Sequence, residues 1–91
     1  MDRKAAIHSL LGVIAFEVLE FIKQAEPSFT DRWVPATYIK DELELNLLCY
    51  PKSGKTQQEQ GWLFSTLARM LEDREVLDYR KKGGHAFYRT K

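Results

Sequence analysis

Apolar residues recur every three or four positions over the first quarter of the chain. This spacing predicts a long helix from about Asp2 to Gln24, with Asp2 as the N-cap and Pro27 ending the pattern. Gly12 is a position where the helix could kink or divide. We expect one face of the helix to point inward, and it consists of Ile7, Leu10, Leu11, Ile14, Val18, Phe21 and Ile22.

The apolar stripe of this helix is wider than one small core needs, because Val13, Phe16 and Leu19 extend it. Two interpretations stay open. The additional residues belong to the core, or they form the interface of a homodimer that is built through the N-terminal helix.

A second, shorter helix is expected after a loop over residues 27–32 and a very short strand at Trp33-Val34. Pro35 suits the first turn of a helix, and the pattern continues from Ala36 to Leu45. The residues expected to point inward are Tyr38, Ile39, Leu43 and Leu45, and those expected to face water are Asp41, Glu42 and Glu44.

A third helix is predicted over about Gln57 to Asp73, after a connection over residues 46–56. Its buried stripe has the spacing i, i+3, i+4, i+7 and consists of Phe64, Leu67, Ala68 and Leu71. The opposite face would then carry Ser65, Thr66 and Arg69.

The last segment predicts a β-hairpin. Glu75–Lys82 and His85–Thr90 flank Gly83-Gly84, and two glycines supply the positive φ angles of a two-residue turn. This register places Tyr79 opposite Tyr88 and Asp78 opposite Arg89. The expected fold is therefore α+β, with a mainly helical three-helix core followed by a C-terminal hairpin, in a single domain over residues 1–91.

The amino-acid composition and the distribution of charge indicate what kind of protein this is and what kind of partner it suits. The chain has 91 residues, of which 44% are hydrophobic and 30% charged, as in an ordinary soluble domain. The net charge is only +1, but the charges are unevenly distributed. Residues 1–51 carry five Lys/Arg and eight Asp/Glu, whereas residues 52–91 carry nine Lys/Arg and five Asp/Glu. The positive C-terminal half would turn toward an anionic partner.

We expect a cytoplasmic protein without a membrane span. The single cysteine, Cys49, excludes an intramolecular disulfide and a cysteine-based zinc site, which fits a reducing compartment. The apolar run from Leu10 to Phe16 is followed at once by Glu17, and it is far shorter than the roughly 20 residues that cross a bilayer.

The order of helix, short strand, helix, helix and hairpin over residues 13–90 resembles the winged helix-turn-helix superfamily. The stretch Phe64–Arg80, FSTLARMLEDREVLDYR, is similar to the third helix and first wing strand of that family. Two features differ. Many members have glycine where Arg74 or Glu75 stands, and the connection over residues 46–56 is longer than the usual turn.

The resemblance implies a DNA-binding protein, such as a small regulator of transcription. The third helix would enter the major groove and the hairpin would follow phosphates or the minor groove. The implied contacts to DNA come from Gln57, Gln58, Gln60, Ser65, Thr66 and Arg69 on the helix, from Arg80, Lys81, Lys82 and His85 on the hairpin, and from Lys52 and Lys55 in the connection.

The alternative is a winged helix that serves as a protein–protein interaction module without binding DNA, since a fold does not imply a function. The near-neutral net charge favours it, and Trp62, Phe16 and Leu19 are its candidate contacts. In that case the cations at the hairpin tip would only protect a solvated edge.

Catalytic and metal chemistry is not expected. Residues 51–56 end in Gly-Lys-Thr, but a phosphate-binding loop needs a glycine where Cys49 stands. His8 and His85 have no acidic or thiol group at ligand spacing, and no serine–histidine–acid set stands out. We therefore expect no enzyme activity, no cofactor and no metal.

Overall fold

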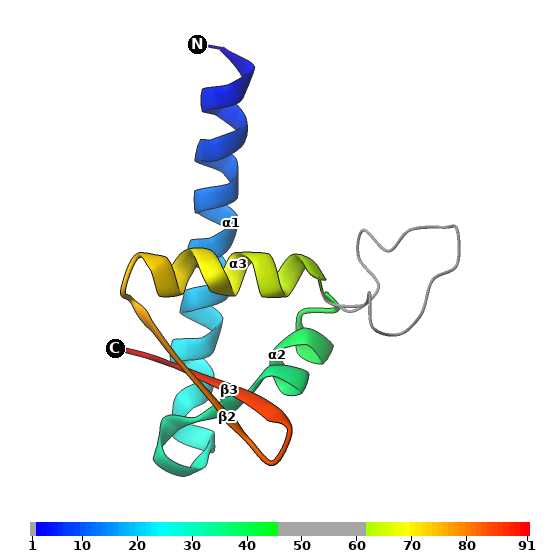
Figure 1. Ribbon diagram of the computed structural model, residues 1–91, viewed down its shortest axis with the longest axis vertical. Helices are drawn as coiled ribbons and strands as arrows, with labels where there is room; N and C mark the ends of the chain where they lie inside the picture. The colour runs from blue at the N-terminus through cyan, green and yellow to red at the C-terminus, as the bar shows by residue number, and fades with distance from the viewer. Residues whose placement is uncertain (1, 46–61) are drawn as a thin grey trace, which may run out of the picture.

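The structure is a computed structural model that describes residues 2–45 and 62–91. In this part of the chain, helix α1 (Arg3–Ala25) is followed by two 3-10 turns, η1 (Glu26–Ser28) and η2 (Thr30–Arg32). Strand β1 (Val34–Pro35), α2 (Ala36–Glu42), α3 (Trp62–Asp73), β2 (Leu77–Lys82) and β3 (His85–Thr90) complete the order. Figure 1 shows a helical core beside an antiparallel sheet in the order β1-β3-β2, so the predicted α+β class is confirmed.

Helix α1 begins at the predicted cap. The Ala5 N–H donates to Asp2 Oδ1 at 2.7 Å, and the helix continues through Gly12 without a break. A Cβ at Gly12 would lie in ordinary van der Waals contact with the Arg74 side chain, 3.4 Å from its Nη2, so the packing here does not require glycine. The open question of a division at Gly12 is thus answered by a single continuous helix.

Only the C-terminal half of α1 packs into the core. Ala15, Val18 and Ile22 are buried, whereas Ile7 and Leu10 are exposed. The prediction that the whole stripe, with Ile14, points inward is wrong. The physical reason is visible in Figure 1, where the other elements pack against the lower part of α1 and its N-terminal turns extend beyond them.

The other two helices bury the predicted residues. Ile39 and Leu45 lie in the core with Phe64, Leu67 and Leu71, while Tyr38 and Leu43 pack against it. Helix α2 is shorter than expected and ends at Glu42. The segment from 57 to 61, which was predicted as the start of the third helix, lies outside the described residues.

Helix α3 ends without a glycine, although the resemblance to winged helices would favour glycine at the position of Arg74 or Glu75. Glu75 adopts a left-handed conformation with φ 62°, and its N–H donates to the Glu72 carbonyl at 2.9 Å. The Val76 N–H donates to the Leu71 carbonyl at 3.2 Å. These two bonds form a Schellman motif, in which a glutamate occupies the position where glycine has the lowest cost.

The hairpin has the predicted turn and register. Gly83 and Gly84 have φ 58° and 81°, as a type I′ turn requires, and Tyr79 lies opposite Tyr88. The expected pairing of Asp78 with Arg89 is also present.

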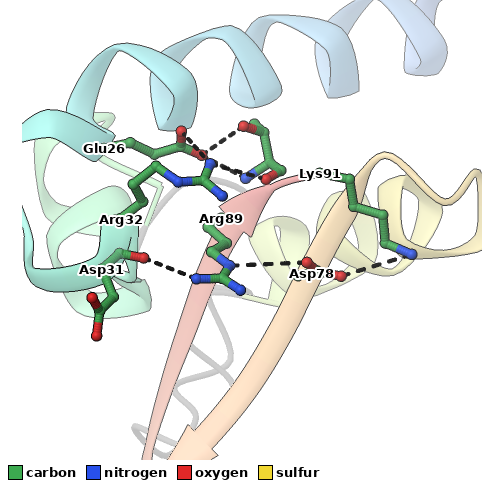
Figure 2. A network of polar contacts seen from close by, with 7 residues as sticks. Glu26, Asp31, Arg32, Asp78, Arg89 and Lys91 are labelled. Atoms are coloured by element: carbon green, nitrogen blue, oxygen red, sulfur yellow. Dashed lines mark hydrogen bonds and ion pairs between the residues drawn. The ribbon is translucent and has the colours of Figure 1, made fainter.

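A buried carboxylate joins the end of α1 to the last strand (Figure 2). Glu26 Oε2 accepts hydrogen bonds from the N–H and the hydroxyl of Thr90, and Oε1 accepts one from Arg32 Nη1 at 3.1 Å. Arg32 has φ 65°, a conformation that this bond helps to hold. The network fixes the base of the hairpin against the helices.

Candidate nucleic-acid interface

The exposed face of α3 carries three of the predicted contact residues. Ser65, Thr66 and Arg69 are exposed, because they lie on the side of α3 opposite the buried stripe that begins at Phe64. This side of the helix has the composition that the sequence predicted, with short hydroxyl side chains beside one cation.

An aromatic cluster connects the buried face of α3 to the sheet. Phe64 packs edge-on against Tyr88 at 5.4 Å between ring centroids, and Tyr79 lies 5.3 Å from Tyr88 on the neighbouring strand. Burial and the charge of Glu72 raise the pKa of Tyr88 to about 12, while Arg69 acts in the opposite direction.

The three consecutive cations of the hairpin do not share one face. Side chains alternate along a strand, so Lys81 lies on the same side of the sheet as Tyr79, and Arg80 and Lys82 lie on the other side. The sequence predicts one basic group of three residues. The strand geometry divides them between two surfaces.

Lys81 lies on the side of the sheet that faces the helices. There it lines a hollow of about 390 Å³ between the start of α2 and the hairpin, together with Thr37, Lys40, Tyr79 and His85. Thr37 and Lys40 are one turn apart on α2, and the sequence analysis did not include them in the site. The hollow thus combines two lysines, a histidine and two hydroxyl groups from separate elements.

Arg80 and Arg89 lie beside Trp33 on the outer face of the sheet. The guanidinium of Arg80 is 5.4 Å from the centre of the Trp33 ring, and that of Arg89 is 4.2 Å from it. Arg80, Lys82 and Phe87 line a second hollow, of about 280 Å³, on this outer face. Trp33 is half-buried, so it serves as a platform for cations rather than as a core residue.

The hairpin tip is the point where both surfaces meet. Lys82 and His85 pair directly beside the Gly83-Gly84 turn, and both are exposed. Of the predicted hairpin contacts, Lys81 and His85 border the α2 hollow, whereas Arg80 and Lys82 border the hollow on the outer face.

Several predicted contact residues lie outside the described residues. They are Gln57, Gln58 and Gln60 of the predicted third helix and Lys52 and Lys55 of the connection. The side chain of Trp62 and the Gly-Lys-Thr segment are also outside this part. Within residues 2–45 and 62–91, no group of three or more His, Cys, Asp or Glu side chains is placed to hold a metal ion.

Cations thus border the sheet on both sides. Comparison with protein-family models, with curated proteins and with solved structures gives no match. The geometry and charge of this surface are the observations on which a functional proposal rests.

Proposed function

We propose that this chain is a winged-helix protein that binds duplex DNA through α3 and the β2–β3 hairpin, as a small cytoplasmic regulator. The sheet order β1-β3-β2, with α2 and α3 inserted between β1 and β2, is the arrangement that a winged helix requires. A three-helix core with a hairpin at its side leaves one helix free to enter a major groove.

The observation that carries the proposal is the pair of cations that line one hollow between α2 and the hairpin. Lys40 on α2 and Lys81 on the hairpin border this hollow, and Arg69 is exposed on α3. These residues come from elements far apart in the sequence. A set of cations drawn together in this way suits a phosphate backbone, because phosphate contacts supply most of the affinity for DNA.

The residues divide into two roles under this proposal. Arg69, with Ser65 beside it, lies on the helix that would enter the groove, where an arginine can form two hydrogen bonds to guanine. Lys40, Lys81 and Lys82 would bind phosphates and position the helix without reading sequence.

A charge-reversal experiment tests the proposal. The double variant Lys40→Glu/Lys81→Glu should lose duplex binding, because two phosphate contacts are replaced by repulsion. Lys23→Glu is the matched control, since Lys23 is exposed on α1 and only pairs with Glu20. Fluorescence anisotropy with a labelled duplex measures both. Equal binding by the double variant and the control would contradict the proposed surface.

The alternative of a protein-interaction module has an observation of its own. Phe16 is exposed, as that reading expected, whereas Leu19 packs partly against the core. The exposed apolar residues are concentrated on α1, apart from the cations of α2 and the hairpin. They therefore indicate a second contact surface and do not replace the first one.

A further inference from the structure

The N-terminal half of α1 carries an uncovered row of apolar side chains. Ile7, Leu10 and Ile14 are 55%, 61% and 46% exposed, and their spacing of three and four places them in one line along the helix. Val13, beside this line, is 55% exposed. A helical segment of this length without packing partners is marginal in water, so the row needs a partner to be stable.

We propose that the row, Ile7, Leu10 and Ile14, is covered by the same row of a second copy of the chain, with the two α1 helices packed antiparallel. A twofold pairing of this kind is isologous, so every contact occurs twice. The row is then covered completely, and no other partner is required. This inference is independent of the proposed DNA binding.

A membrane is the competing occupant. By length and composition alone, the segment Arg3–Ser28 could cross one. However, Ala15, Val18 and Ile22 are buried in the core of the domain. The free part, residues 3–14, is only about 18 Å long at the helical rise of 1.5 Å per residue, and a hydrocarbon core is about 30 Å thick. A crossing would have to unpack the domain.

The charges on α1 favour a second copy in the antiparallel orientation. The helix begins with Arg3 and Lys4 and carries Glu17 and Glu20 two to three turns beyond the row's centre. If Ile7 of one copy faces Ile14 of the other, Lys4 lies level with Glu17 of the second copy. The helix dipoles then also oppose each other, whereas a parallel pair would place like charges side by side.

Beyond Ile14, the surface has a hollow along which the first turns of α1 from the second copy would lie. Along α1, the row of side chains continues from Ile14 to Glu17 and Phe21. These two residues border a hollow of about 390 Å³, which Leu43 and Leu67 also line. In the antiparallel pair, the first turns of the second copy would lie along the mouth of this hollow. Apolar contact and ion pairing would therefore extend past both ends of the row.

Disulfide crosslinking tests the orientation. In a Cys49→Ser background, chains with Ile7→Cys and chains with Ile14→Cys are prepared separately and then mixed. The antiparallel pair predicts a disulfide-linked dimer in the mixture and little in either chain alone. Phe16→Cys, on another side of the helix, is the control and should not crosslink. Crosslinking of Ile7→Cys or Ile14→Cys with itself would overturn the orientation.

Sedimentation equilibrium tests the association itself. The full-length chain should be dimeric, and Leu10→Glu should weaken the dimer by on the order of 100-fold or more, because this residue lies near the twofold axis in both copies. Phe16→Glu is the matched control and should remain dimeric, and circular dichroism shows whether each variant is folded. A monomeric wild-type chain, or its flotation with phospholipid vesicles in place of self-association, would overturn the proposal.

Charge exchange gives a third readout. Arg3→Glu/Lys4→Glu should weaken the dimer, and the addition of Glu17→Lys/Glu20→Lys to the same chain should restore it. Failure of the fourfold variant to recover, while it remains folded, would count against the antiparallel pairing.

Discussion

Replacement of Glu26 by glutamine should destabilise the fold by about 2–3 kcal/mol, although the two side chains have nearly the same shape. Glu26 is 5% exposed and accepts three hydrogen bonds, two from Thr90 on Oε2 and one from Arg32 on Oε1. A glutamine has only one acceptor oxygen. In either orientation its NH₂ group faces a donor.

The magnitude follows from the better of the two orientations. With its oxygen toward Thr90, the glutamine keeps both Thr90 bonds but loses their charge assistance, a loss of roughly 0.5–1 kcal/mol for each bond. The bond to Arg32 is lost as well, at about 1 kcal/mol, since Arg32 is half-exposed and regains water. The reverse orientation would place the NH₂ group against the Thr90 N–H, a buried donor that would lose its acceptor, and would cost more.

Urea denaturation at neutral pH, followed by circular dichroism at one fixed protein concentration, measures this change. Glu42→Gln is the matched control, because Glu42 is exposed on α2 and its replacement should change stability by less than about 0.5 kcal/mol. If Glu26→Gln is as stable as the control, the buried carboxylate does not hold the hairpin base against α1, and the reasoning is refuted.

Further predictions concern pH and the helix ends. Burial alone would raise the pKa of Glu26, but the hydrogen bonds from Thr90 and Arg32 outweigh it and lower the pKa below 4.5. The stabilisation is therefore complete above that pH and lost as the pH falls through the folded-state pKa, so acid denaturation of Glu26→Gln should show a shallower dependence on pH. Glu75→Gly should stabilise the domain by about 0.5–1 kcal/mol in thermal unfolding, because glycine adopts positive φ freely, whereas Glu75→Ala should not. Gly84→Ala should destabilise the domain by about 1 kcal/mol, because alanine adopts the positive φ of this position only at a cost. An unchanged midpoint of thermal unfolding would count against the turn geometry.

Local patterns in the sequence were sufficient for the hairpin and the core face of α3. The Gly83-Gly84 pair fixes the turn, and the turn fixes the register that joins Tyr79 to Tyr88. The buried stripe beginning at Phe64 follows from helical periodicity alone. These features depend on neighbours in the chain, which is why they could be predicted without the tertiary structure.

The part of α1 that the rest of the domain covers could not be predicted in the same way. Periodicity indicates which side of a helix is apolar, but not how far the rest of the domain covers it. Ile7 and Ile14 therefore satisfied the pattern although no described element covers them. The apolar width that Val13 and Phe16 add was the signal that one core does not account for this helix.

The candidate site was predicted only in part for two physical reasons. The division of Arg80 and Lys82 from Lys81 follows from strand alternation, so it was available in the sequence once the strand was assigned. The contribution of Lys40 was not available, because α2 meets the hairpin only through tertiary packing. A carboxylate such as Glu26 gives no periodic signal at all.

The salt dependence of duplex binding tests the central claim most directly. If Lys40, Lys81, Lys82 and neighbouring cations neutralise phosphates, the logarithm of the binding constant should fall with the logarithm of salt concentration, with a slope of roughly −3 to −4 per copy. The slope should become shallower by almost one for each of these lysines changed to alanine. A slope near zero, or no binding to duplex DNA even at low salt, would contradict the account.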